Sequence, residues 1–320
     1  MKEFQDKLAA IEASLNRMDL PHSPANLYEP IHYFLALGGK RIRPLFAILC
    51  AELYGIPIKE SMPGALSLEL FHNFTLIHDD IMDKAPVRRG LATVHEKWNT
   101  NIAILSGDVL MMQSFRLLEQ YDASKYKRLL TLLQKTAVEV CEGQQLDMDF
   151  EGENEVLEKD YIEMIRLKTS VLLGCSCAFG GIIGDAPEED IQALYGFGEQ
   201  LGIAFQIQDD LLDAFGDSNK VGKQSGGDIL CDKKTILFTT FQSKASTQEK
   251  LQFEEFRRLE GLGKIEQIKG LYLNTGVHAY CLDKQRFHLK NALDFLEKLS
   301  VSYSKESLLK IADYMIQRVH

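Results

Sequence analysis

Two aspartate clusters with the same internal spacing are the residues best suited to chemistry. Each has the form D-D-x-x-D at the end of an apolar run, in FTLIHDDIMD and in AFQIQDDLLD. The six carboxylates are Asp79, Asp80, Asp83, Asp209, Asp210 and Asp213. On a helix, positions i and i+4 lie about 40° apart around the axis, so the outer two carboxylates of each cluster point the same way. One such cluster could be a solvated acidic face, but two with the same spacing indicate a shared cation, because close carboxylates repel one another and are costly to bury.

The chemistry of the ligands favours magnesium. Mg²⁺ prefers oxygen ligands and is usually held by one or two carboxylates together with substrate phosphates. Two carboxylate clusters on facing helices would therefore make a polynuclear Mg²⁺ site able to grip a diphosphate. A di-iron bundle, the rival carboxylate site, needs Glu-x-x-His pairs on its helices, and we do not expect one here.

Two basic clusters accompany the acidic ones. GGKRIRP places Lys40, Arg41 and Arg43 in a glycine-tightened loop, and RRG places Arg88 and Arg89 shortly after Asp83. Arginine binds phosphate oxygens bidentately, while lysine acts as a point charge. Either cluster alone would be read as solvated surface. Beside the aspartates, they predict a site for two anionic groups, one bound through metal and one bound directly.

Composition excludes several classes of protein. The formal charge of the 320 residues is −10, which argues against a nucleic-acid or anionic-membrane binder. The first residues lack the apolar core of a signal peptide. The longest uncharged run, residues 169–184, is short for a membrane span, so we predict a buried helix and no transmembrane segment. The six cysteines show no metal or redox spacing, which predicts reduced thiols and a cytoplasmic location.

The elements that must position these residues are predicted to be helices. None of the eight prolines lies beyond residue 187 or between residues 86 and 187. Long proline-free stretches with apolar residues every three or four positions indicate long helices, and alternating β-branched runs are nearly absent. We therefore predict one all-α domain over residues 1–320.

These motifs together resemble those of the trans-isoprenyl diphosphate synthases, the polyprenyl synthetase family. The match runs along nearly the whole chain, through GGKRIRP, HDDIMD with RRG, GQQLD, LKTS, FQIQDDLLD, GKQSGGD and KKT. The resemblance implies a single large helical bundle around a deep central cavity, the isoprenoid synthase fold. It also implies a homodimer whose substrates are isopentenyl diphosphate and allylic diphosphates.

The resemblance also implies roles for individual residues. About three Mg²⁺ ions would be ligated by Asp79, Asp83 and Asp209, with support from Asp80, Asp210 and Asp213. The allylic diphosphate would be held by Arg88, Lys168, Lys223 and Lys233. Isopentenyl diphosphate would be bound without metal by Lys40, Arg43, His72 and Arg89. The oxygens of Thr169 and Gln206 would face the developing carbocation. Without the family match, His72 would be read as a core histidine.

Residues just before the first aspartate cluster bear on product length. In the family, an aromatic residue five positions before the cluster and a small one at four resemble the C20 pattern, and here these are Phe74 and Thr75, with Phe71 one turn deeper. The absence of a two-residue insertion in DDIMD differs from the usual bacterial C15 pattern. We therefore expect geranylgeranyl diphosphate (C20) as product, with farnesyl diphosphate (C15) as the alternative and a longer chain less favoured. Phe74 could instead be ordinary helix packing.

Two other functions compete with the synthase. A class I terpene cyclase would replace the second aspartate cluster and would not need GGKRIRP. A regulatory subunit without activity typically loses one aspartate motif, whereas both are intact here. Two segments stay without a function: the carboxyl end, IQRVH, lacks the basic tail of some relatives, and the charged segment Ser243–Lys264 carries no motif. We expect that segment to be a helical excursion on the surface.

Overall fold

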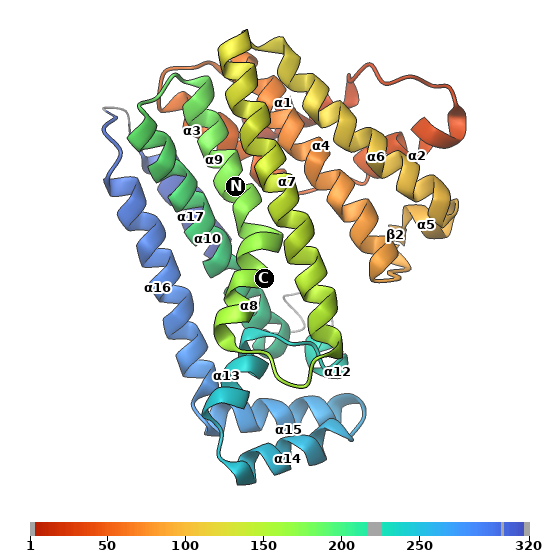
Figure 1. The fold of residues 1–320 in the computed structure, drawn as a ribbon, viewed down its shortest axis with the longest axis vertical. Coiled ribbons are helices and arrows are strands. Elements are labelled where there is room, and N and C mark those ends of the chain that lie inside the picture. The colour runs from red at the N-terminus through yellow and green to blue at the C-terminus, as the bar shows by residue number, and fades with distance from the viewer. Residues whose placement is uncertain (1–3, 217–225, 302–303, 317–320) are drawn as a thin grey trace. The chain divides into compact units, whose positions relative to one another are not determined.

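The computed structural model describes residues 4–216, 226–301 and 304–316 and is built almost entirely of helices (Figure 1). This confirms the all-α prediction. The exception within the described residues is a short antiparallel hairpin of β1 (Val87–Arg88) and β2 (Leu91–Ala92), which pairs Arg88 with Leu91. It lies in the loop predicted after the first aspartate cluster. Arg89 and Gly90 form its turn with φ of 52° and 80°, in the left-handed region.

The chain divides into two compact units. The first unit contains residues 1–134, 176–191 and 300–304, and the second contains residues 135–175, 192–299 and 305–320. One aspartate cluster falls in each unit. The predicted single domain over residues 1–320 stays a prediction.

The first unit is built around the long helix that carries the first aspartate cluster. Its complete helices are α1 (Gln5–Asn16), α2 (Ala25–Ala36), α3 (Ile42–Glu52), α4 (Ile58–Met82), α5 (Val94–Lys97), α6 (Thr100–Leu117) and the 3₁₀ helix η2 (Leu118–Gln120). Helix α4 packs against both α3 and α6. Leu68, Leu70 and Phe71 of α4 are fully buried in this core. The apolar side chains before the aspartates therefore fix α4 in place.

Three long helices contribute residues to both units. They are α7 (Ala123–Gly152), α9 (Val171–Ile183) and α10 (Glu188–Phe215). The other helices of the second unit are α8 (Glu158–Ile165), the π-helix η3 (Arg166–Ser170), α12 (Gly227–Leu230), α13 (Ile236–Lys244), α14 (Thr247–Arg257), α15 (Gly261–Asn274), α16 (Val277–Glu297) and α17 (Glu306–Ile316). The second aspartate cluster lies near the end of α10.

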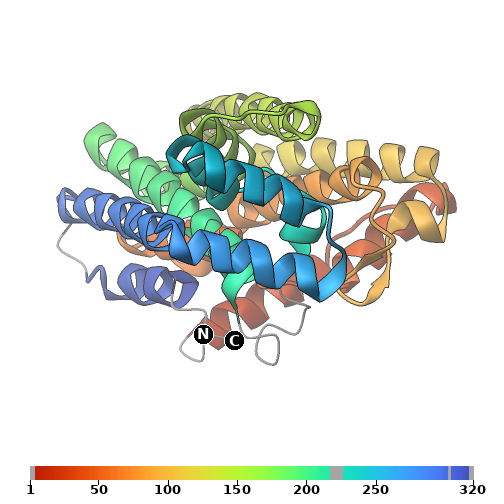
Figure 2. The ribbon, with the colours of Figure 1, turned by 90° about the horizontal axis from the view of Figure 1, so that it is seen from below.

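Aromatic side chains hold α14 and α15 to the core of the second unit. The two helices lie side by side (Figures 1 and 2). The ring of Phe253 on α14 stacks on Phe241 of α13 at 5.0 Å between centroids, and Tyr272 of α15 completes the cluster. A capping box formed by Ser246 and Glu249 begins α14, as the S-x-x-E pattern predicts. The charged segment Ser243–Lys264 is therefore helical, but it is anchored by buried rings.

Within the described part of the chain, one stretch, Glu158–Ile183, is long and apolar enough to cross a membrane by length and composition. Of its most apolar window, 83% is buried inside the protein. This degree of burial is that of a core helix, as predicted for residues 169–184.

Candidate active site

The first aspartate cluster divides its carboxylates between two environments. Helix α4 ends at Met82, and the amide of Asp83 donates to the carbonyl of Asp79 at 2.8 Å. Asp79 is partly exposed and Asp83 is exposed, whereas Asp80 is only 1% exposed. The carboxylate of Asp80 accepts three hydrogen bonds of 2.7–2.9 Å from Nε and Nη2 of Arg88 on the hairpin. Asp80 and Arg88 therefore neutralise each other in this structure.

The basic loop before α3 is anchored by its central arginine. Gly38, Gly39 and Arg41 have φ of 77°, 155° and 48°, so the chain turns sharply there. Arg41 is 3% exposed, and its guanidinium donates to Glu69 at 2.6 Å and to Glu12 at 2.8 Å. Arg41 is therefore bound by carboxylates of the protein itself and anchors the loop.

Arg43, His72 and Arg89 lie together in the first unit. Nη1 of Arg43 donates to Nε2 of His72 at 3.1 Å, and because a guanidinium only donates, Nε2 is the unprotonated ring nitrogen. Burial lowers the pKa of His72 well below 6.5, and the positive charges of Arg43 and Arg89 lower it further. Arg89 packs its guanidinium on Gly39, where a Cβ would be 3.0 Å from Nη2. Among the described side chains, Nε of Arg43 is buried without an acceptor, which suits a site for an anion.

The second unit contains a polar cavity of about 190 Å³. Its predicted site residues are Lys168, Thr169, Gln206, Asp209, Asp210, Asp213 and Lys233. It is lined further by Asp147, Tyr161, Met164, Ile165, Asp228, Lys234 and Thr235. Lys223 lies outside the described residues. The structure therefore brings seven of the predicted residues into one cavity.

A π-helix presents Lys168 and Thr169 to this cavity. The wide turn η3 (Arg166–Ser170) interrupts the helical path between α8 and α9, and single π turns of this kind are frequent at functional sites. The ammonium group of Lys168 forms an ion pair with Asp147 of α7. A Cβ on Gly143 would lie closer than 3.0 Å to the backbone nitrogen of Lys168, so glycine is required for this approach.

Hydrogen bonds connect Thr169 to the second aspartate cluster. The hydroxyl of Thr169 donates to Oε1 of Gln206 at 3.4 Å, and Nε2 of Gln206 donates to Oδ1 of Asp210 at 3.3 Å. The other oxygen of Asp210 accepts from the Tyr161 hydroxyl and from the amide of Ile236, the latter at 3.0 Å. Burial raises the pKa of Asp210 to about 7, against the lowering effect of the Tyr161 and Ile236 donors. Asp210 is therefore fixed by protein donors on both oxygens.

The cavity's remaining carboxylates suit a hard divalent cation. Oδ2 of Asp213 accepts from the amide of Asp228 at 2.9 Å. Burial raises the pKa of Asp228 to about 6; Lys233 opposes this shift, while Asp213, Asp209 and Asp147 add to it. No three histidine, cysteine or acidic side chains converge on one metal position among the residues that the structure describes. The carboxylates that line the cavity are oxygen ligands of the kind that a hard divalent cation such as Mg²⁺ takes together with water and phosphate.

Sequence reasoning missed seven residues that line this cavity, among them Asp147, Asp228 and Tyr161. Asp147 and Asp228 stand in the motifs GQQLD and GKQSGGD, but neither belongs to a D-D-x-x-D cluster. Tyr161 precedes Lys168 by seven positions, and only its contact with Asp210 reveals its part in the site. The spacing of Asp147 after the glycine of GQQLD was the signal available in the sequence.

One expectation about metals needs a correction. The sequence does contain Glu-x-x-His pairs, Glu29 with His32 and Glu69 with His72. Glu69 accepts from Arg41, and Nε2 of His72 faces the guanidinium of Arg43. Because the second pair is committed to arginines, the di-iron alternative still fails, for a reason that the sequence did not provide.

An all-helical fold with two aspartate-rich helix ends, each with basic residues nearby, defines the isoprenoid synthase class. The family model described as polyprenyl synthetase matches residues 24–273, and the chain belongs to this family. It is 37% identical to the geranylgeranyl pyrophosphate synthase of Geoglobus acetivorans, over 99% of this chain and 98% of that one. It is 35% identical to the geranylgeranyl diphosphate synthase of Methanosarcina mazei, over 99% and 97%. The crystal structure of geranylgeranyl pyrophosphate synthetase from Pyrococcus horikoshii matches with a TM-score of 0.92 at 34% identity, covering 99% and 98%.

Two other relatives bear on product and metal. A geranylfarnesyl diphosphate synthase of Natronomonas pharaonis is 32% identical over 92% of this chain and 91% of that one. A polyprenyl synthase of Caulobacter crescentus, crystallised with calcium and isoprenyl diphosphate, matches at 25% identity with a TM-score of 0.83, covering 100% and 96%. These comparisons confirm the predicted family, fold class and prenyltransferase activity. The chain is a short-chain isoprenyl diphosphate synthase.

Proposed function

We propose that the protein is a Mg²⁺-dependent geranylgeranyl diphosphate synthase that adds isopentenyl diphosphate to allylic diphosphates. The observation that carries the C20 product is the packing of Phe74. Its side chain is 7% exposed, and its ring lies 5.5 Å from that of Phe71 and 4.8 Å from that of His78. It lies five positions before Asp79, which is about 7.5 Å along the helix axis. A chain growing down α4 from the aspartates would meet this ring.

The neighbours of Phe74 support this placement. Thr75 turns its hydroxyl back to the carbonyl of His72 at 2.8 Å, so it presents a small side chain with its polar group satisfied. Phe71 lies one turn deeper and is fully buried. The names of the relatives add support, although the geranylfarnesyl relative makes a C25 product the alternative to test alongside C15.

We infer that the aspartate clusters hold the metal. The ligands would be Asp79 and Asp83 of the first cluster and Asp209 and Asp213 of the second. Bound Mg²⁺ would neutralise the allylic diphosphate and make it a better leaving group. Asp210, which is held by Tyr161 and Ile236, would fix the geometry of its neighbours in the cluster.

The chain's own oxygens would stabilise the allylic cation. The Thr169 hydroxyl donates its hydrogen bond to Gln206. The lone pairs of the Thr169 oxygen are therefore its remaining interaction sites in the cavity. Gln206 is oriented in turn, because its amide nitrogen donates to Asp210. Preorganised dipoles of this kind are effective where water is excluded.

The second diphosphate would be bound directly by Lys40, Arg43 and Arg89. The free donor of Arg43 supports this assignment, as does the packing of Arg89 on Gly39. His72 would orient Arg43 and add no charge, since its pKa is lowered far below neutrality. In this structure Arg88 uses Nε and Nη2 on Asp80, so its proposed role toward the allylic diphosphate would fall to Nη1.

We also infer a homodimer in the cytoplasm. Leu105 and Met112 are 57% and 53% exposed, and they lie two turns apart on one face of α6. Large apolar side chains that share an exposed helix face mark an association surface.

The test is a product assay. The purified chain is incubated with Mg²⁺, labelled isopentenyl diphosphate and a C5, C10 or C15 allylic starter, and the products are sized after dephosphorylation. A C20 product is expected. A C15 or C25 product keeps the reaction but overturns the role of Phe74, and no product from any starter would favour a regulatory subunit.

A further inference from the structure

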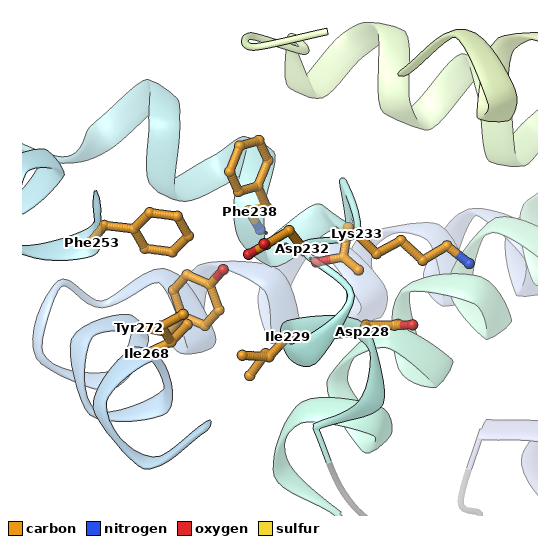
Figure 3. A pocket seen from close by; sticks show the side chains of 9 residues that line it. Asp228, Ile229, Asp232, Lys233, Phe238, Phe253, Ile268 and Tyr272 are labelled. Atoms are coloured by element: carbon orange, nitrogen blue, oxygen red, sulfur yellow. Dashed lines mark hydrogen bonds between the residues drawn. The ribbon is translucent and has the colours of Figure 1, made fainter. Parts of the chain in front are cut away.

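The turn of residues 226–235, which leads into α13, has two faces with different chemistry. Figure 3 shows Asp228 and Lys233 pointing to one side of the turn, where both line the 190 Å³ cavity. Asp232 points to the opposite side, toward Tyr272 of α15. A small cavity of about 20 Å³ lies between the turn and the side chains of α14 and α15, and Asp228, Asp232 and Lys233 all contribute to its lining. The turn therefore separates the polar cavity from the α14–α15 pair.

The backbone of the turn is tightly closed. The single helical turn α12 ends with the amide of Lys233 donating to the carbonyl of Asp228 at 2.9 Å, and the amide of Asp232 donating to that of Ile229 at 3.3 Å. This is the closure of a Schellman motif, whose left-handed position is usually glycine. Here that residue is Asp232, with φ of 54°. Because this position favours glycine, the presence of an aspartate indicates that its carboxylate makes a stabilising contact.

That side chain is bound by two cations from α14 and α15. Oδ1 of Asp232 lies 3.0 Å from Nζ of Lys264 and 3.2 Å from Nε of Arg257. Nζ of Lys264 also donates to the carbonyl of Leu230 at 3.2 Å. Lys264 is only 5% exposed, whereas Arg257 is partly solvated. Lys264 thus binds the turn at two points, through one side chain and one carbonyl.

Helix α15 also contacts the start of the turn. A Cβ on Gly226 would lie 2.8 Å from Cδ1 and Cγ2 of Ile265, the residue after Lys264. The amide of Gly226 donates to the carbonyl of Asp213 at 2.6 Å. Helix α15 therefore supports the turn at both ends, and the turn is hydrogen-bonded to the second aspartate cluster.

We propose that Lys264, through Asp232 and the Leu230 carbonyl, is a positioning residue that sets Asp228 and Lys233 for a metal-bound diphosphate. The inference rests on the proposed function, because it concerns the diphosphate side of that site. It gives a role to the charged segment Ser243–Lys264: α14 and the start of α15 form the support of the turn, and Lys264 touches no substrate.

The test measures binding of inorganic diphosphate with Mg²⁺ by calorimetry on the full chain. The variants are Lys264→Met, which removes the charge but keeps the length, and Asp232→Asn. Each is expected to weaken diphosphate binding about tenfold, as loss of an outer partner of a metal site does. Lys264→Arg should recover most of the affinity. Lys290→Met is the matched control, because Lys290 forms an exposed ion pair with Asp294 at 2.7 Å.

Steady-state kinetics separates positioning from general damage. The KM for the allylic substrate should rise in Lys264→Met and Asp232→Asn, while the KM for isopentenyl diphosphate stays within about twofold, since the latter's ligands lie elsewhere. Asp232→Gly provides a second test. Glycine suits the left-handed backbone, which offsets part of the cost of leaving buried Lys264 without its carboxylate, so this variant should fold yet still lose diphosphate affinity.

The outcomes are distinct. If the unaltered protein does not bind Mg²⁺-diphosphate, the proposed function fails, and the inference fails with it. If the unaltered protein binds but Lys264→Met and Asp232→Asn bind equally well and merely melt earlier, the contact is structural and the inference is overturned. If Lys264→Met does not fold, Asp232→Gly decides, and full affinity in that variant refutes the positioning role.

Discussion

Gly143 of α7 lies directly against the backbone of Lys168 in the π-helix, so that a Cβ on Gly143 would overlap the Lys168 amide nitrogen. This contact sets the distance between α7, which carries Asp147, and the turn that carries Lys168 and Thr169. Backbone cannot yield as a flexible side chain can. The glycine of GQQLD is therefore a requirement of the site's geometry.

We expect Gly143→Ala to lower both stability and activity. Overpacking at a backbone contact typically costs about 1–3 kcal/mol of unfolding free energy. The Lys168–Asp147 ion pair should be displaced, so kcat should fall as well. Urea unfolding and kcat are the measurements. Gly270→Ala is the control, because nothing lies within 4 Å of its Cβ position in α15, and alanine there should stabilise the helix by up to about 1 kcal/mol. Equal effects of the two variants would contradict the contact.

Phe74→Ala should lengthen the product to C25 or beyond. Removing the ring opens space on α4 below the aspartates and leaves Phe71 as the next barrier. The fold should also lose about 3–5 kcal/mol, the usual cost of deleting a buried phenylalanine. Product sizing on the folded variant is the measurement. Phe287→Ala, at an exposed position on α16, is the control. An unchanged C20 product from Phe74→Ala would place the barrier elsewhere.

Asp79→Ala and Asp209→Ala should each nearly abolish diphosphate release. Each removes a proposed oxygen ligand of Mg²⁺, which the other carboxylates of its cluster cannot replace at the same position. Removal of Mg²⁺ with a chelator should have the same effect on the unaltered enzyme and should be reversed by adding the metal. Asp294→Ala, at an exposed ion pair, should leave the rate unchanged. Full activity in either cluster variant would refute the metal assignment.

His72 should stay neutral across the physiological range. Its pKa in the folded state is lowered, first by burial and then by Arg43, Arg89 and other nearby arginines. The unfolded chain therefore binds the proton more tightly, so the contribution of His72 to stability is present above pH 6.5 and is lost as the pH falls toward the folded pKa. Imidazole NMR signals in the folded protein should show no titration of His72 near pH 6.5. Titration at that pH would mean that Arg43 does not face Nε2.

Sequence reasoning located the helices that carry the aspartate clusters because apolar spacing and proline positions are local signals. It set Asp80 apart from Asp79 as a supporting residue, but it could not show that Asp80 is buried and paired with Arg88, which returns on a hairpin. It grouped Arg41 with phosphate ligands by proximity, whereas Glu12 and Glu69 bind it from other helices. Lys264 was read as part of a surface segment for the same reason. Long-range partners decide the burial of a charge, and spacing does not report them.

The π-helix at Arg166–Ser170 has a consequence for how this chain tolerates change in length. A π turn accommodates one residue more than an α turn, so deleting a single residue there would let α8 run into α9 as continuous helix. The backbone would lose no hydrogen bond that it could not remake, and the surrounding helices would keep their register. Lys168 and Thr169 would nevertheless be rotated or lost. Activity therefore depends partly on the number of residues in this segment. A relative that is one residue shorter here would keep the fold but lose the reaction.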